Sequence, residues 1–263
     1  MDPVRRIADA VLYEGYLLWP YRRSALKNQR RWTFGGVFPP AHSAAHPDDR
    51  SRVRAECLLE GSRDVDVTVR FLHVALRDED GWEVAIEREL GPGPIAIDGG
   101  AADGLRWESL RGSVDVDLAD GRVVLEVLNA TPFAGDRPAA LRRSFCSLHA
   151  VLRSEGEFVS AREPQSASCR SEGLWPVLVE DRHTMLAAPI ILDDFPAIAE
   201  ESPGDLFDGG EIDELLYLNV LALTDAEKDE MRATDARARE ILERAESLTP
   251  AQLMRLHGEG RPV

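Results

Sequence analysis

The sequence predicts a mainly β protein with some α structure: a β-sandwich-like core, an N-terminal helical arm and a helical C-terminal segment. Apolar and polar residues alternate along several segments between positions 53 and 160, which is typical of half-buried strands. Asp-Gly pairs at 80–81 and 120–121 separate such segments, as hairpin turns do. Helix-start signals lie near the N-terminus and after position 209. We therefore divide the chain into three parts: residues 1–50, 51–192 and 193–263.

An amphipathic helix is predicted at the N-terminus. Asp2 can cap it and Pro3 suits its first turn. Its apolar face comprises Val4, Ile7, Ala8, Val11 and Leu12. Gly15 and the Trp19-Pro20 pair should end it, because a residue that precedes proline is disfavoured in the α conformation. Positions 41–50 are predicted to be a surface loop or linker.

The middle part is predicted to contain two hairpins. The first joins residues 65–71 to 82–86, and the second joins 114–118 to 123–127. Residues 141–152 fit a helix or a strand, and the strand-like stretch 157–160 beside them favours a strand. Further apolar stretches lie at 175–179 and 187–192. Several strands separated by turn signals favour a β-sandwich.

The last part is predicted to be helical. One helix should cover 211–223, after Gly209-Gly210. Thr224 and Glu227 form a capping-box pattern, which should open a longer charged helix that ends near position 246. Thr249 followed by proline predicts a further helix start.

Charge and cysteine content exclude several classes of protein. The formal net charge is −16, yet residues 1–54 hold ten Lys and Arg against five Asp and Glu. A chain this acidic is repelled by a phosphate backbone, so we expect no nucleic-acid partner. No run of about 18 apolar residues and no signal-peptide cleavage site are present, which predicts a cytoplasmic protein without a membrane span. Cys57, Cys146 and Cys169 contain no CxxC pair and indicate reduced thiols.

No catalytic motif stands out. The signatures GxxxxGK, GxGxxG, HExxH and GxSxG are absent, and we predict no cofactor. Residues 115–126 resemble a calcium loop only in composition, because the glycine falls one place late, so a hairpin is favoured. Cys146 and His149 could form a metal pair, but two ligands do not complete a site. A buried cysteine beside a hydrogen-bonded histidine is the favoured interpretation.

The segment 193–230 holds thirteen Asp and Glu and one basic residue, Lys228. Its carboxylates could bind a hard cation or act as acid and base, the weak candidates being Asp193, Asp194, Asp205 and Asp208. Acids near helix starts also complement the helix dipole, and an acidic face could meet a basic partner. Because no histidine lies in the segment, we expect no metal centre there.

Residues 13–38 form an aromatic and basic arm that holds seven of the 17 aromatic residues. Tyr, Trp and Arg are the residues that most often anchor protein interfaces. The candidate partner-binding residues are Tyr13, Tyr16, Trp19, Tyr21, Arg22, Arg23, Lys27, Arg30, Arg31, Trp32 and Phe34. Alternatively, the arm wraps the sandwich and satisfies the protein's own acidic face, and the sequence leaves both interpretations open.

Residues 11–40 and, more loosely, 185–228 resemble an uncharacterised family associated with nickel-iron hydrogenase gene clusters of actinobacteria and some other bacteria. The resemblance implies a cytosolic accessory, assembly or maturation role beside a hydrogenase, with a hydrogenase subunit or maturation factor as partner. It implies no reaction and no catalytic residues. We therefore expect a non-catalytic accessory protein that acts by protein–protein interaction. The alternatives are an enzyme that uses carboxylates of 193–214, with or without a divalent metal, and a β-sandwich ligand-binding module.

Overall fold

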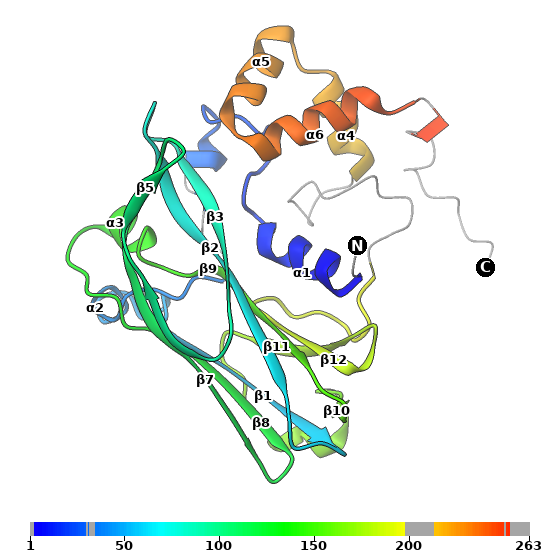
Figure 1. Ribbon diagram of the computed structural model, residues 1–263. Coiled ribbons are helices and arrows are strands. Elements are labelled where there is room, and N and C mark those ends of the chain that lie inside the picture. Colours follow the sequence, from blue (N-terminus) through cyan, green and yellow to red (C-terminus); the bar gives the residue numbers. More distant parts are fainter. Residues whose placement is uncertain (1–2, 30, 32–34, 198–212, 250, 253–263) are drawn as a thin grey trace. The chain divides into compact units, whose positions relative to one another are not determined.

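The computed structural model describes residues 3–29, 31, 35–197, 213–249 and 251–252 (Figure 1). The chain divides into two compact units, each discontinuous in sequence. Unit 1 comprises residues 1–12 and 34–196, and unit 2 comprises residues 13–33 and 197–263. The three parts expected from composition are consecutive, so their boundaries differ from those of the units.

The described residues of unit 1 form two antiparallel sheets, which confirms the predicted sandwich-like, mainly β fold. The five-stranded sheet has the order β10 (Glu157–Val159), β1 (Arg52–Glu60), β8 (Arg122–Asn129), β7 (Leu110–Ala119) and β4 (Gly93–Ile97). The seven-stranded sheet has the order β11 (Trp175–Val179), β12 (Asp181–Ala188), β9 (Cys146–Arg153), β2 (Asp66–Arg77), β6 (Leu105–Trp107) and β5 (Gly100–Ala102), with β3 (Glu83–Leu90) also paired to β2.

The core of unit 1 lies between the two sheets. The inward residues of the alternating segments supply it, among them Val67, Val69 and Phe71 of β2 and Val123, Leu125 and Val127 of β8. It also contains Phe71 and Phe145, whose ring centroids lie 4.8 Å apart. In β8 the period-two pattern of the sequence is also the pattern of burial, since successive side chains of a strand point to opposite faces. Strand β2 is buried on both faces from Val69 to Ala75, which alternation alone did not predict.

Both predicted hairpins are present. Ala119 pairs with Arg122, and the two turn residues between them, Asp120 and Gly121, have φ values of 51° and 73°. These positive values are those of a type I′ turn, which Asp-Gly favours. In the β2–β3 hairpin, Asp80 accepts a hydrogen bond from the backbone N–H of Trp82 at 3.0 Å. The ambiguous 141–152 segment is strand β9 from Cys146, as favoured, and it follows the short helix α3 (Arg137–Leu141).

Helix α1 (Pro3–Tyr13) confirms the predicted N-terminal helix. Val4, Ala8 and Val11 pack on the seven-stranded sheet, against a cluster that includes Val151 and Leu186. The predicted 41–50 loop begins differently, because helix α2 (Pro40–Ser43) covers its first residues, with Pro40 at its first position. Unit 1 also contains the 3₁₀ helix η2 (Pro164–Ser168), and Leu26–Gln29 of unit 2 forms the 3₁₀ helix η1.

The described helices of unit 2 are α4 (Asp213–Leu221), α5 (Asp225–Thr234) and α6 (Ala236–Ser247). The capping box of Thr224 and Glu227 is present at the start of α5, as predicted. The prediction of a single helix as far as position 246 was wrong. Asp235 has an extended backbone with φ −158° and separates α5 from α6. Its carboxylate caps α6 by accepting a hydrogen bond from the Arg237 N–H at 2.8 Å. Within the described ranges, no helix has the length and apolar character needed to cross a membrane.

Candidate functional site

The tyrosines of the aromatic arm are buried inside unit 2. The Tyr16 hydroxyl donates a hydrogen bond to Asp235 at 2.7 Å, and the guanidinium of Arg237 lies 4.5 Å from the Tyr13 ring centroid. Tyr21 is fully buried. Burial first, and then the charge of Asp235, raise the pKa of Tyr16, so its hydroxyl keeps the proton that it donates. The contacts named for Tyr13 and Tyr16 are intramolecular, and they are made within unit 2.

Two arginines of the arm are also engaged within unit 2. Arg22 forms an ion pair with Glu227 at 3.0 Å, and the buried Arg31 lies 5.4 Å from the Tyr16 ring centroid. Hydrogen bonds from the backbone and side chain of Thr224, followed by the charge of Arg22, lower the pKa of Glu227. Three of the candidate residues, Arg30, Trp32 and Phe34, lie outside the described residues.

A single asparagine holds the middle of the arm in one conformation. Asn28 accepts a hydrogen bond from the Leu18 N–H at 2.8 Å and donates to the carbonyls of Leu18 and Arg22 at 2.8 and 3.0 Å. We call residues 18–28 the arm loop. Its backbone also bonds to α5, since Arg23 N–H donates to the Thr234 hydroxyl at 3.2 Å.

The arm loop exposes a short polar and apolar strip. Leu26 is 81% exposed, and Arg23 and Lys27 on either side of it in the sequence are also exposed. Trp19 is half-buried, with its ring centroid 6.0 Å from that of Tyr21. Of the candidate residues that the structure describes, Arg23 and Lys27 are exposed, and Trp19, like Arg22, is half-buried.

Two of the acidic candidates, Asp193 and Asp194, are described by the structure, and both contact neighbouring segments of unit 1. Asp193 forms an ion pair with Arg162. Asp194 accepts hydrogen bonds from the Ser160 hydroxyl and from the Leu178 N–H, the latter at 2.9 Å. Asp205 and Asp208 lie outside the described residues. In the described part of the chain, no group of three or more His, Cys, Asp or Glu residues is placed to hold a metal ion.

Cys146 and His149 are both buried in unit 1, as predicted. Burial raises the pKa of the Cys146 thiol. Burial, and then the charge of Arg70, lower the pKa of His149 to about 3, and its Nδ1 lies 3.3 Å from the Ser147 carbonyl oxygen. His149 is therefore neutral at physiological pH.

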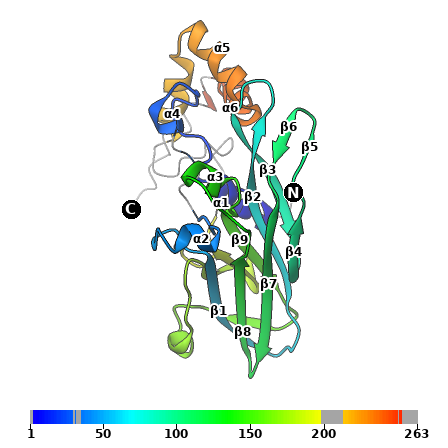
Figure 2. The same cartoon turned by 90° about the vertical axis from the view of Figure 1, so that its left-hand side faces the viewer.

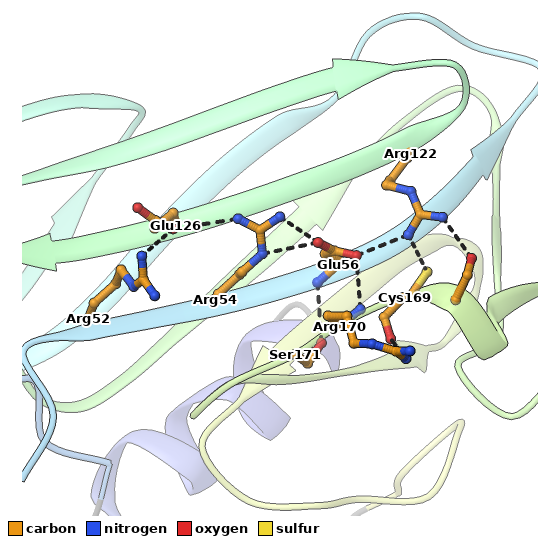
Figure 3. A network of polar contacts seen from close by, with 9 residues as sticks. Arg52, Arg54, Glu56, Arg122, Glu126, Cys169, Arg170 and Ser171 are labelled. Carbon is orange, nitrogen blue, oxygen red and sulfur yellow. Dashed lines mark hydrogen bonds and ion pairs between the residues drawn. The ribbon is translucent and has the colours of Figure 1, made fainter. Parts of the chain in front are cut away.

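A polar network that the sequence did not reveal lies on the outer face of the five-stranded sheet (Figure 3). Glu56, with a side chain only 8% exposed, accepts hydrogen bonds from Arg54 Nη2 at 2.5 Å, Arg122 Nη1 at 3.0 Å and the Arg170 N–H at 2.8 Å. Burial alone would raise the pKa of Glu56, but the bonds from Arg54 and from the Arg170 backbone outweigh it and lower that pKa. Glu126 continues the network, 3.5 Å from Arg54.

A cavity of about 320 Å³ lies beside Glu56. Its wall includes Cys169, whose Sγ lies 3.4 Å from Arg122 Nη1, and Trp175. Burial raises the pKa of the Cys169 thiol, and the positive charge of Arg122 opposes this. The buried Ser166 hydroxyl also lines the cavity and has no hydrogen-bond partner among the described residues.

The sequence signal for this site is weak. Arg52, Arg54 and Glu56 alternate along one face of β1, which is ordinary for an exposed strand face. The remaining members come from β8 and from residues 169–171, far away in the chain. No protein-family model matches the chain, and no curated protein matches it.

Proposed function

We propose that this protein is a non-catalytic accessory protein that acts by protein–protein interaction, and that the arm loop is its contact surface. The observation that carries the proposal is the exposure of Leu26 between two cations, on a loop that Asn28 holds in place. A single exposed leucine is common on protein surfaces and does not by itself indicate a binding site. Its placement on a pre-ordered cationic loop is what favours a contact role.

A pre-ordered loop binds with less loss of conformational entropy than a free one. The three hydrogen bonds of Asn28 remain within the loop, so a partner need not supply them. Arg23 and Lys27 favour an acidic partner surface and would accelerate association, and Leu26 and Trp19 would supply the apolar contact.

The kind of partner follows from the resemblance of residues 11–40, which include the whole arm loop. We take the partner to be a nickel-iron hydrogenase subunit or maturation factor, in the cytoplasm. Both the partner and the location belong to the proposal.

The proposal predicts that Leu26→Asp weakens partner binding by roughly 30-fold, because truncating or charging an interface anchor costs about 2 kcal/mol. Tagged protein is purified from its native host, co-purifying subunits are identified by mass spectrometry, and affinity is measured with the purified partner. Lys27→Glu should mainly slow association at low salt.

Arg63→Glu is the matched control for Lys27→Glu, because Arg63 is also exposed and the charge change is the same. Its binding should equal that of the wild type. If Leu26→Asp and Lys27→Glu both bind the hydrogenase-related partner as the wild type does, or if no such partner co-purifies, the proposal is wrong.

The enzyme alternative depends on carboxylates of the 193–214 segment. Asp193 and Asp194 already have protein partners, which leaves Asp205 and Asp208 as its candidates. We expect calorimetric titration with Mg²⁺, Ca²⁺, Mn²⁺ and Ni²⁺ to show no tight binding. Stoichiometric binding that Asp205→Asn or Asp208→Asn abolishes would favour the enzyme instead.

The ligand-binding alternative is favoured by one observation, the cavity beside Glu56. Its size and mixed lining suit a small molecule, since binding sites combine apolar walls with a few polar groups.

A further inference from the structure

We infer that unit 1 binds a small ligand carrying a carboxylate or phosphate group, in a cavity at the β5–β6 end of the seven-stranded sheet. The inference is independent of the arm loop and of the function proposed for it. Strands β3, β5 and β6 lie together at this end of unit 1 (Figure 2). The cavity has a volume of about 560 Å³, and Trp107, Arg106 and Arg142 are among its lining residues.

Trp107 forms a fixed wall of this cavity. Its indole N–H donates to the Asp98 carbonyl at 3.1 Å. The ring packs so closely on β5 that a Cβ at Gly100 would lie 3.0 Å from Cζ2 of the ring. The guanidinium carbon of Arg88 lies 5.6 Å from the ring centroid. A ligand would therefore meet an ordered aromatic side chain with a guanidinium group beside it.

Arg88 carries a charge that nothing nearby neutralises. No carboxylate among the described residues lies within ion-pair distance of it, although the side chain is half-buried. Its Nη2 lies 3.3 Å from Nδ1 of the buried His73, which can accept this hydrogen bond only in its neutral form. Its Nε is buried without a hydrogen-bond partner in the described chain. Guanidinium groups withdrawn from water are normally paired with an anion.

Arg142 lines the cavity, and its guanidinium also lacks close hydrogen-bond acceptors in the described chain. Its nearest carboxylate, Glu83, is 3.7 Å away, which is beyond hydrogen-bond distance. Its Nε is buried, and no acceptor from the described ranges reaches it. A guanidinium presents several N–H donors in a planar fork that matches the two oxygens of a carboxylate or phosphate.

The charges around the cavity do not balance. Two lining arginines each have one carboxylate within ion-pair distance, Arg106 with Asp78 and Arg142 with Glu83, and the lining Glu108 is paired with Arg143. Arg88 lies behind the lining, beside the Trp107 ring, and has no carboxylate partner in the described chain, so one positive charge next to the cavity is left unmatched. One bound anion would offset this charge and accept hydrogen bonds from Arg142. The acidity of the whole chain disfavours a nucleic acid and leaves a small ligand.

The test is NMR titration of the full-length protein with inorganic phosphate and, separately, with succinate, at low ionic strength because salt screens such contacts. The probe is the Trp107 indole N–H signal, assigned from its loss in Trp107→Phe. We expect a saturable shift with at least one anion, and the tighter of the two identifies phosphate or carboxylate as the natural group. Arg142→Met and Arg88→Met should each weaken binding at least tenfold.

Arg63→Met, on the exposed segment between β1 and β2, is the matched control and should bind as the wild type does. Absence of a saturable shift with both anions would overturn the inference, as would unchanged affinity in Arg142→Met. If Arg142→Met and Arg88→Met do not fold, Arg106→Met decides, because that side chain is 62% exposed and lines the cavity. Weaker binding in Arg106→Met supports the site, and unchanged binding contradicts it.

Discussion

Unit 1 should lose about 4 kcal/mol of its free energy of unfolding between pH 7 and pH 5, because two buried histidines must stay neutral. Burial, and then the charge of Arg88, lower the pKa of His73 to about 4. The same cause, followed by the charge of Arg70, lowers the pKa of His149 to about 3. In the unfolded chain both residues titrate near 6.5.

The sign follows from proton binding. Between pH 6.5 and the lowered pKa values, the unfolded chain binds protons that the folded unit does not, so acid favours unfolding. The stabilisation is complete above about pH 7 and is lost as the pH falls through 6.5 toward 4. At pH 5 each histidine accounts for about 2 kcal/mol of the loss. This window lies above the range in which Glu56, with its lowered pKa, becomes protonated.

The measurement is urea unfolding at pH 7, 6 and 5. His73→Gln and His149→Gln should each remove about half of the pH dependence, whatever they do to stability at pH 7, because glutamine does not titrate. His46→Gln is the control, since His46 is exposed. If the free energy of unfolding of the wild type is the same at pH 7 and pH 5, the prediction is wrong, because protonation of these histidines then does not destabilise the folded unit.

Local sequence signals predicted the elements that are stabilised by residues close to one another in the sequence. The Asp120-Gly121 turn needs two positive φ values, and these two residue types adopt them readily. The capping box needs only Thr224 and Glu227, which lie three residues apart. Alternation predicted which residues of β2 and β8 face the other sheet, because a strand contacts one side with every second side chain. It did not predict that β2 is also buried on its other face.

Long-range contacts produced what the sequence did not predict. No glycine or proline interrupts residues 225–246, so the pattern predicted one helix. The break occurs at Asp235, where the Tyr16 hydroxyl, 219 residues earlier in the chain, donates a hydrogen bond to the carboxylate. Composition drew attention to the arm as unusual. It did not show that Tyr13, Tyr16 and Tyr21 are buried, because a tyrosine suits a core or an interface equally well.

The Glu56 network also depends on long-range contacts that the sequence did not predict. Its removal should have the second large effect on stability. Glu56→Ala should lower the free energy of unfolding of unit 1 by about 3 kcal/mol, since it leaves two guanidinium groups and a backbone N–H without their shared acceptor. Glu126→Ala is the matched control on the same face. Because Glu126 is 29% exposed and 3.5 Å from Arg54, its loss should cost under about 1 kcal/mol.

The cost of Glu56→Ala should also depend on pH. The lowered pKa of Glu56 means that its stabilisation is present at neutral pH and is lost as the pH falls below about 4.5. Wild type and variant should therefore approach one another in stability at acidic pH. Equal stability at pH 7 would contradict the assignment of Glu56 as the shared acceptor of this network.

A thiol readout separates the loss of charge from a general loosening of the fold. Burial raises the pKa of Cys169, the charge of Arg122 lowers it, and the charge of Glu56 raises it further. Removing the carboxylate leaves Arg122 unopposed beside the thiol, so Glu56→Ala should increase the thiolate fraction and the rate of alkylation of Cys169 by iodoacetamide. Cys146 is fully buried and serves as the internal control. Faster alkylation of Cys169 alone indicates the electrostatic effect, whereas equal acceleration at Cys146 would mean that the unit opens and that the network acts only through stability.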